Sequence, residues 1–214
     1  ESNYTHFVLT NGSNAGYLSS ITINYEESAS VSTVTEYEAD DDTRSTDIEA
    51  SECVIVKGTG ILTFTGSNKG NTANLIIEDG GQLICNNNPT VTMQKSITGY
   101  GNNNEVKTGW NFIASPITEE LSPSSEFMLW NTYDLYRLNN TTWENYRAHT
   151  QDFTINNGKG YLYANSGNVT LSFTGTIKPF TTESNANQVA LTDGWNLVGN
   201  PFGEPAYINM PFYL

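Results

Sequence analysis

The amino-acid sequence predicts an all-β protein, with an antiparallel β-sandwich or jelly-roll-like C-terminal domain preceded by the short strands of a β-roll or a meander. Helical periodicity of apolar residues is nearly absent along the 214 residues, whereas alternation of apolar and polar residues recurs. Turns rich in Asn and Gly separate the alternating runs. Charged residues make up only 15% of the chain, against about 25% in an average globular domain. A surface of hydroxyls and amides is typical of secreted all-β proteins.

Residues 1–50 are predicted to hold N-terminal strands and an acidic linker. The runs "YTHFVLT" and "YLSSITINY" alternate in polarity on either side of the turn "NGSNAG". The stretch "EESASVSTVTEYEADDDTRSTDIEASE" that follows is acidic and poor in apolar residues. We therefore expect a linker or an exposed excursion there, with one edge strand over Val31–Tyr37.

Residues 51–104 have a different pattern of apolar residues, which form short runs at irregular intervals. The runs "CVIV", "ILTF", "NLII", "QLI" and "VTM" are separated by Gly, Asn and Lys. Short strands with glycine corners predict a few turns of a coil-like β-roll, as in a parallel β-helix. An ordinary meander fits the uneven intervals as well, so the sequence leaves both arrangements open.

Residues 105–214 form the best-defined unit, and they predict the β-sandwich domain. The runs "YDLYRL" and "TWENYRA" on either side of "NNT" predict one hairpin. The runs "GKGYLYA" and "VTLSFTG" on either side of "NSGN" predict a second hairpin. Strict alternation in the last run is typical of a half-buried antiparallel strand.

One sequence motif, here called the phrase, occurs twice, once before and once after these hairpins. "GWNFIASP" begins at Gly109, and "GWNLVGNP" begins at Gly194. We interpret the pair as an opening and a closing strand whose tryptophans, Trp110 and Trp195, are buried in the core as structural supports. The prolines at the end of each phrase are expected to terminate the strands, because proline cannot donate to a β-ladder.

The charge balance excludes two classes of partner. The chain has nine Lys and Arg against 23 Asp and Glu, a formal net charge of −14, and a pI near 4.3. Nucleic-acid backbones and anionic membrane surfaces both require clustered cations, and the nine here are scattered. No apolar run approaches the roughly 20 residues that span a bilayer, so we predict no membrane insertion.

The sequence indicates neither a metal site nor a cofactor. Cys53 and Cys85 are either a disulfide, worth about 3–4 kcal/mol, or two buried free thiols. With His6 and His149 far away, no spacing matches a zinc site. The acidic stretch does not fit a calcium loop counted from Asp40, because Arg44 falls at a ligand position and the turn glycine is missing.

No catalytic residue is predicted, and we expect that the protein is not an enzyme. The chain contains no GxSxG elbow, HExxH, P-loop or dinucleotide motif. A glycosidase needs only two facing carboxylates, but a chain with 23 of them supplies neighbouring pairs by chance. We interpret the following six carboxylates as solvated surface groups: Glu119, Glu120, Glu126, Asp134, Glu144 and Asp152.

Aromatic residues in the first hairpin are the candidate ligand-binding residues. Sugars stack their apolar ring faces on aromatic planes while amides and charged groups address the hydroxyls. The candidates are Tyr133, Tyr136, Trp143 and Tyr146. The alternative is that these aromatics only stabilise the sheet, since strands favour Tyr and Trp anyway.

A resemblance covers roughly residues 54–206. "LIIEDGGQLICNN", "GWNFIASPI", "GKGYLYAN", "VTLSFTG" and "GWNLVGNPF", in that order, resemble the C-terminal regions of large surface and secreted proteins of Bacteroidetes. That group includes adhesins and proteins that accompany secreted hydrolases. The resemblance implies placement outside the cell or on the bacterial cell surface, and a modular role without catalysis.

Together these observations predict a non-catalytic cell-adhesion or binding module with glycans or host-cell and other surface proteins as partners. The alternatives are a polysaccharide-active enzyme or its accessory domain, and a purely structural spacer. A binder should expose an aromatic patch, an enzyme should form a cleft with two carboxylates, and a spacer should bury both Trp110 and Trp195.

Overall fold

The computed structural model describes residues 31, 33–38, 42–68, 74–101, 109–123, 132–148, 153–179 and 189–205. Within these ranges the chain is rich in strands with almost no helix, which confirms the all-β prediction. The strands form sheets of five, four and three strands. The two strands predicted within residues 4–25 lie outside the described residues.

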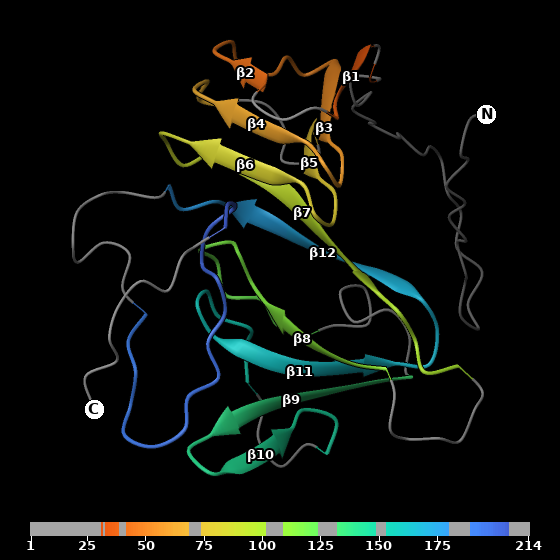
Figure 1. Cartoon of the computed structure of the whole chain (residues 1–214), viewed down its shortest axis with the longest axis vertical. Coiled ribbons are helices and arrows are strands. Elements are labelled where there is room, and N and C mark those ends of the chain that lie inside the picture. Colours follow the sequence, from red (N-terminus) through yellow and green to blue (C-terminus); the bar gives the residue numbers. More distant parts are fainter. Residues whose placement is uncertain are drawn as a thin grey trace, which may run out of the picture.

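A parallel β-roll forms the first part of the fold. Strands β1 (Thr33–Tyr37), β3 (Glu52–Val56), β5 (Leu75–Ile77) and β7 (Thr90–Ile97) pair in parallel in the five-stranded sheet. Strands β2 (Asp42–Arg44), β4 (Ile61–Phe64) and β6 (Gln82–Cys85) make the three-stranded sheet, also in parallel. Successive strands alternate between the sheets (Figure 1), so the chain winds as a roll and not as a meander.

The core of the roll comes from the inward-facing residue of every second position. Val54, Leu75, Phe64 and Leu83 are at most 1% exposed and belong to one hydrophobic cluster. Close stacking of successive turns requires glycine at one corner, because a Cβ on Gly81 would lie 2.9 Å from two backbone carbonyl oxygens of the preceding turn.

The first turn of the roll lies in the stretch for which the sequence predicted an acidic linker. β1 is an edge strand, as predicted for Val31–Tyr37, but it pairs with β3, and β2 pairs with β4. The Arg44 guanidinium binds the Glu52 carboxylate at 2.6 Å, and Ile48 is 2% exposed. The sequence indicated a linker here because apolar residues are scarce. Backbone pairing and one ion pair stabilise this turn of the roll instead.

Strand β12 (Val169–Thr176) joins the C-terminal residues to the roll. It pairs antiparallel with β7 over eight residues, with Phe173 opposite Met93. It does not pair with β11 (Gly160–Asn165), so the predicted second hairpin is wrong. β12 lies within the predicted sandwich domain of residues 105–214, yet it shares a sheet with strands of the predicted segment 51–104.

The reason is a competing set of hydrogen bonds at the predicted turn. The backbone N–H groups of Tyr100 and Gly101 donate to the carbonyls of Asn165 and Ser166, at 3.0 and 2.9 Å. The Gly99 N–H donates to the side-chain oxygen of Asn168 at 2.9 Å. The turn is therefore held by the chain that follows β7, and this arrangement directs β12 onto β7.

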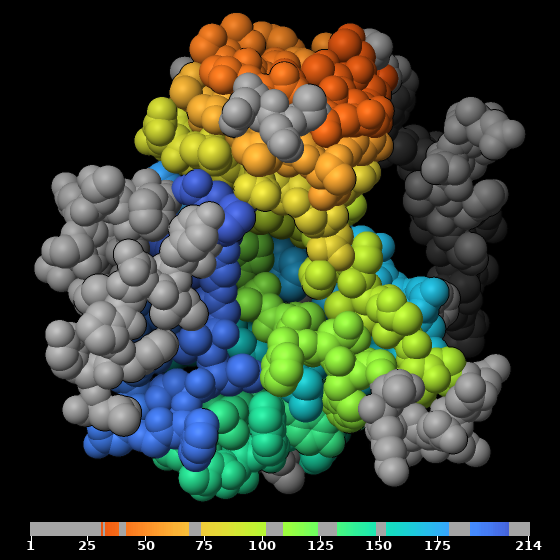
Figure 2. Space-filling model, in the orientation of Figure 1, coloured from red at the N-terminus to blue at the C-terminus, as the bar shows by residue number. Residues whose placement is uncertain are grey.

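The four-stranded antiparallel sheet lies beyond β12, at the opposite end of Figure 1 from the roll. Its order is β10-β9-β11-β8, with β8 at Trp110–Ala114, β9 at Tyr133–Asn139 and β10 at Thr142–Asn145. The pairing of β9 with β10 confirms the first predicted hairpin. Leu135, Tyr161 and Tyr163 are buried on its inner face. Figure 2 shows residues 189–205, in blue, running along one side of this sheet.

Both cysteines are free and buried, so the structure decides between the two alternatives in favour of thiols. Burial, followed by the charge of Glu204, raises the pKa of the Cys85 thiol to about 12. Burial also raises the pKa of Cys53.

We predict that neither thiol of the folded protein is labelled by an aromatic disulfide reagent at about pH 8, where an exposed thiol is partly ionised. Both should react within the mixing time after denaturation in urea, which provides the control. Rapid labelling of one thiol in the folded protein would contradict the burial of that residue.

A cysteine pair should trap the β7–β12 pairing. The hydroxyl oxygens of Thr92 and Thr174 lie 3.0 Å apart on opposite strands, so Thr92→Cys/Thr174→Cys should oxidise readily and stabilise the fold by about 4 kcal/mol. Thr92→Cys/Thr170→Cys is the matched control, because Thr170 lies opposite Ser96. Non-reducing electrophoresis distinguishes the variants, and equal cross-linking of both would contradict the register.

Candidate functional site

The two tryptophans of the repeated phrase lie at the surface. Trp110 is 38% exposed and Trp195 is 75% exposed. The prediction that both are buried supports is therefore wrong.

Each phrase folds into the same local turn, and this turn explains why the indoles are not buried. Gly109 and Gly194 have positive φ angles of 96° and 92°, a conformation that side chains disfavour. The side-chain amides of Asn111 and Asn196 donate to the carbonyls of these glycines at 2.9 and 3.0 Å. Glycine and asparagine close the turn without help from the tryptophan between them.

The backbones of the two phrases do act as a structural support, because they meet at the start of β11. The side-chain amide of Asn157 donates to the carbonyls of Ser115 and Pro201, at 3.2 and 3.1 Å. A Cβ on Gly199 would overlap the side chain of Ala114, the equivalent residue of the other phrase. The repeat therefore joins two backbones while leaving their tryptophans outside.

The outer face of the four-stranded sheet carries a row of aromatic residues, here called the outer aromatic face: Trp110, Phe112, Tyr136 and Trp143. Directly opposed residues share a face of an antiparallel sheet. Phe112 and Tyr136 both lie opposite Leu162, while Trp143 lies opposite Leu138. Phe112 is 69% exposed and Trp143 is 45% exposed. The Trp110 and Tyr136 rings meet edge to face, 5.6 Å between centroids.

Polar groups stand among these rings. Asp134 and Asn145 share the outer face with Tyr136, since Asn145 lies opposite Tyr136 and Asp134 lies two residues before it. The Asn145 amide donates weakly to the Asp134 carboxylate at 3.5 Å. An amide and a carboxylate therefore lie beside the aromatic row, where they can bind hydroxyl groups of a ligand.

The structure separates the four residues predicted to bind a ligand. Tyr136 and Trp143 lie on the outer face. Tyr133 is 8% exposed and stacks on Tyr163 in the core, and Tyr146 packs edge-on against a buried phenylalanine while its hydroxyl donates to the Pro123 carbonyl at 3.1 Å. Tyr133 and Tyr146 therefore pack toward the core and are not part of the outer aromatic face.

Sequence reasoning missed Trp110 and Phe112. Alternation in "WNFIA" places these two on one side and Asn111 and Ile113 on the other, but alternation alone does not tell which side is buried. Only the pairing of Ile113 with Tyr161 assigns it to the inner face, where it is 4% exposed.

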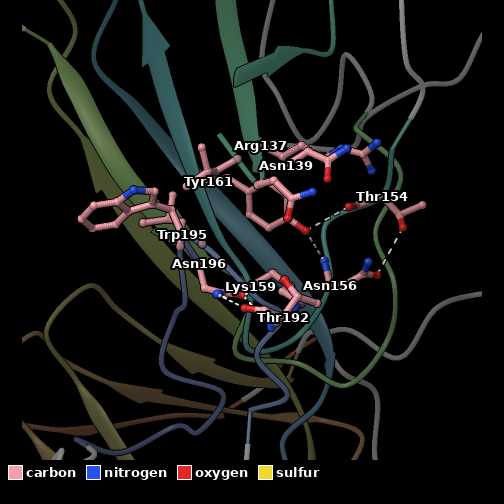
Figure 3. A pocket seen from close by; sticks show the side chains of 13 residues that line it. Arg137, Asn139, Thr154, Asn156, Lys159, Tyr161, Thr192, Trp195 and Asn196 are labelled. Carbon is pink, nitrogen blue, oxygen red and sulfur yellow. Dashed lines mark hydrogen bonds between the residues drawn. The ribbon is translucent and has the colours of Figure 1, made fainter. Parts of the chain in front are cut away.

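A polar cavity of about 300 Å³ lies at the end of this sheet, where β9 ends and β11 begins. Tyr161 lies among the labelled side chains, whereas the indole of Trp195 projects away from them at the margin (Figure 3). The polar part of the lining includes Arg137, Asn139, Thr154, Asn156, Lys159 and Asn196.

The ionisable groups of the polar cavity are held by defined partners. The Arg137 guanidinium donates to the Glu144 carboxylate, and hydrogen bonds from Asn139 and then Arg137 lower the pKa of Glu144. Burial raises the pKa of Tyr161. The Tyr161 hydroxyl donates to the Thr154 carbonyl at 3.0 Å and accepts the Asn156 N–H at 2.9 Å.

The carboxylates that could serve an enzyme have structural partners where the structure describes them. Glu119 accepts hydrogen bonds from the Thr176 hydroxyl and N–H, at 2.6 and 2.7 Å. Burial opposes ionisation of Glu119, but these bonds lower its pKa. Among the described residues, no group of three or more His, Cys, Asp and Glu side chains could hold a metal ion. His6, Asp40, Glu126, His149 and Asp152 lie outside the described residues.

Comparison with protein-family models, curated proteins and solved structures finds no match for this chain. In the described ranges, no helix has the length and apolar character needed to cross a membrane. The outer aromatic face and the polar cavity are therefore the features of the molecule from which we infer its function.

Replacement of Asn157 tests the joint between the two phrases. Asn157→Ala leaves two part-buried carbonyls without their side-chain donor, so we expect a loss of about 1–3 kcal/mol in the free energy of unfolding, measured in urea. Asn139→Ala is the matched control, because its exposed amide donates to the Glu144 carboxylate and should cost less. An equal effect of both variants would contradict a supporting role for Asn157.

Proposed function

We propose that this chain is a non-catalytic carbohydrate-binding and adhesion module of a secreted or cell-surface bacterial protein, and that the outer aromatic face binds the glycan. The observation that carries the proposal is the row of Trp110, Phe112, Tyr136 and Trp143 on one open sheet face. Exposed aromatic side chains in a row are uncommon on a surface that has no partner.

The geometry of the face fits an extended sugar chain. Trp143 and Trp110 stand on the two edge strands of the sheet, β10 and β8. Three strand spacings separate these strands, which corresponds to about 14 Å. A row of this length offers several rings in sequence to successive sugar units, while Asp134 and Asn145 are placed to bind hydroxyls.

The same observations favour a binding module over the two alternatives. A structural spacer has no need of exposed aromatics, and both repeated tryptophans are exposed. For an enzyme, a pair of carboxylates should face each other across a cleft. Glu119 and Glu144 instead have structural hydrogen-bond partners, which supports a role without catalysis.

The module would present this surface at one end of the molecule. We propose that the four-stranded sheet and the segments packed on its inner face form the sandwich-like C-terminal domain, with the β-roll as its stem. Placement outside the cell accords with the amide- and hydroxyl-rich composition and with the resemblance to Bacteroidetes surface proteins.

A glycan array with the wild type, Trp143→Ala and Trp110→Ala tests the proposal. Each replacement removes one stacking ring, so binding should weaken at least about tenfold, or about 1.4 kcal/mol, while circular dichroism stays unchanged. Val34→Ala is the matched control, because Val34 is an exposed apolar residue of the β-roll, 57% exposed, and its loss should leave binding intact.

Binding that is equal in all four proteins would reject the outer aromatic face as the site. A folded wild type that binds no glycan would reject the carbohydrate proposal, and would direct attention to protein ligands on cell surfaces.

A further inference from the structure

We infer that the polar cavity is a second binding site, and that it takes a single neutral sugar unit such as the end or a branch of a glycan. This inference rests on the proposed function, and it adds a site that differs from the outer aromatic face in shape and chemistry.

The polar cavity lies on the other side of the sheet from the outer aromatic face. Arg137 and Tyr161 of its lining lie opposite each other on the inner face that also carries Leu135. The cavity is therefore a separate site, reached at the end of the sheet.

The size of the cavity limits its occupant. Its volume of about 300 Å³ is at the lower end of the about 300–1,000 Å³ that is usual for ligand pockets. This space accommodates a single sugar ring, whereas an extended chain needs an open surface.

The cavity wall offers both donors and acceptors, as hydroxyl groups require. The Asn156 side-chain oxygen shares the single proton of the Thr154 hydroxyl with Glu120, and the Asn156 NH₂ group supplies two further donors. The Asn139 amide nitrogen donates to Glu144, which leaves its oxygen available. The Lys159 ammonium has three donors and donates at 3.2 Å to the Ala190 carbonyl.

The charge of the cavity favours a neutral ligand. Glu144 compensates Arg137 through their ion pair. The second cation, Lys159, shares the cavity lining with Thr154, whose hydroxyl oxygen lies 3.3 Å from the Glu120 carboxylate. With two cations and two carboxylates, the site has no excess positive charge to compensate a phosphate or a uronic acid.

Trp195 provides an apolar surface at the margin of the cavity. Its neighbour Asn196 fixes the loop, since the Asn196 side chain accepts from the Thr192 N–H and hydroxyl and donates to the carbonyls of Thr192 and Gly194. The indole itself is 75% exposed. A rigid loop that presents an open indole beside a polar cavity is suited to stacking one sugar ring.

Titration with methyl glycosides of neutral hexoses tests this second site, with tryptophan fluorescence and two-dimensional NMR as the measurements. At least one glycoside should bind to the wild type. Asn156→Ala and Trp195→Ala should each weaken that binding at least about tenfold, whereas Trp143→Ala should leave it within about twofold. Trp195→Ala is informative even if Asn156→Ala alters folding, because the indole is exposed.

The outcomes separate this inference from the proposed function. If an oligosaccharide binds and depends on Trp143 but no methyl glycoside binds, the second site is rejected and the outer aromatic face stands. Glycoside binding that survives both cavity replacements also rejects it, as does tighter binding of the methyl glycoside of a uronic acid. If neither oligosaccharides nor glycosides bind to the folded protein, both proposals fail.

Discussion

The pairing of β12 with β7 is the interaction on which the rest of the structure depends. It closes the five-stranded sheet of the roll and buries Leu171 and Phe173 in the shared core. The residues after β12 then hold both phrase-bearing segments, since Ile177 bridges to Ile117 and Lys178 bridges to Phe202. Without this strand, the four-stranded sheet would lose its main connection to the roll.

Phe112 and Trp143 on the outer face of that sheet are 69% and 45% exposed in the described structure, and local interactions satisfy the backbones of the two phrases. Each Gly-Trp-Asn turn closes through its own glycine and asparagine, and Asn157 joins the two backbones. These turns therefore close without help from the indoles, of which Trp195 is 75% exposed and Trp110 is 38% exposed and packs on Tyr136. The polar cavity beside Trp195 offers amides and hydroxyls on the other side of the sheet, where Arg137 and Tyr161 of its lining lie opposite each other.

Local features of the fold could be predicted from the sequence, whereas features that depend on distant partners could not. The β9–β10 hairpin and the edge strand β1 follow from short-range alternation. The choice between roll and meander required knowledge that Val54 pairs with Leu75. The pairing of β12 likewise required knowledge of a distant partner, because β7 lies far earlier in the chain. For the site, the aromatic hairpin was predicted, but the sides of Trp110, Phe112 and Tyr133 depend on which face packs on the core.

Binding at the outer aromatic face is tested most directly by the NMR signal of each tryptophan indole during titration with a glycan that the protein binds. Selective replacement of single tryptophans assigns the signals. We expect that the indole signals of Trp110 and Trp143 shift in proportion to occupancy, while backbone signals of the roll, such as those of Val54 and Phe64, stay unchanged. Saturation that moves only signals from the roll, and leaves both indoles unaffected, would contradict it.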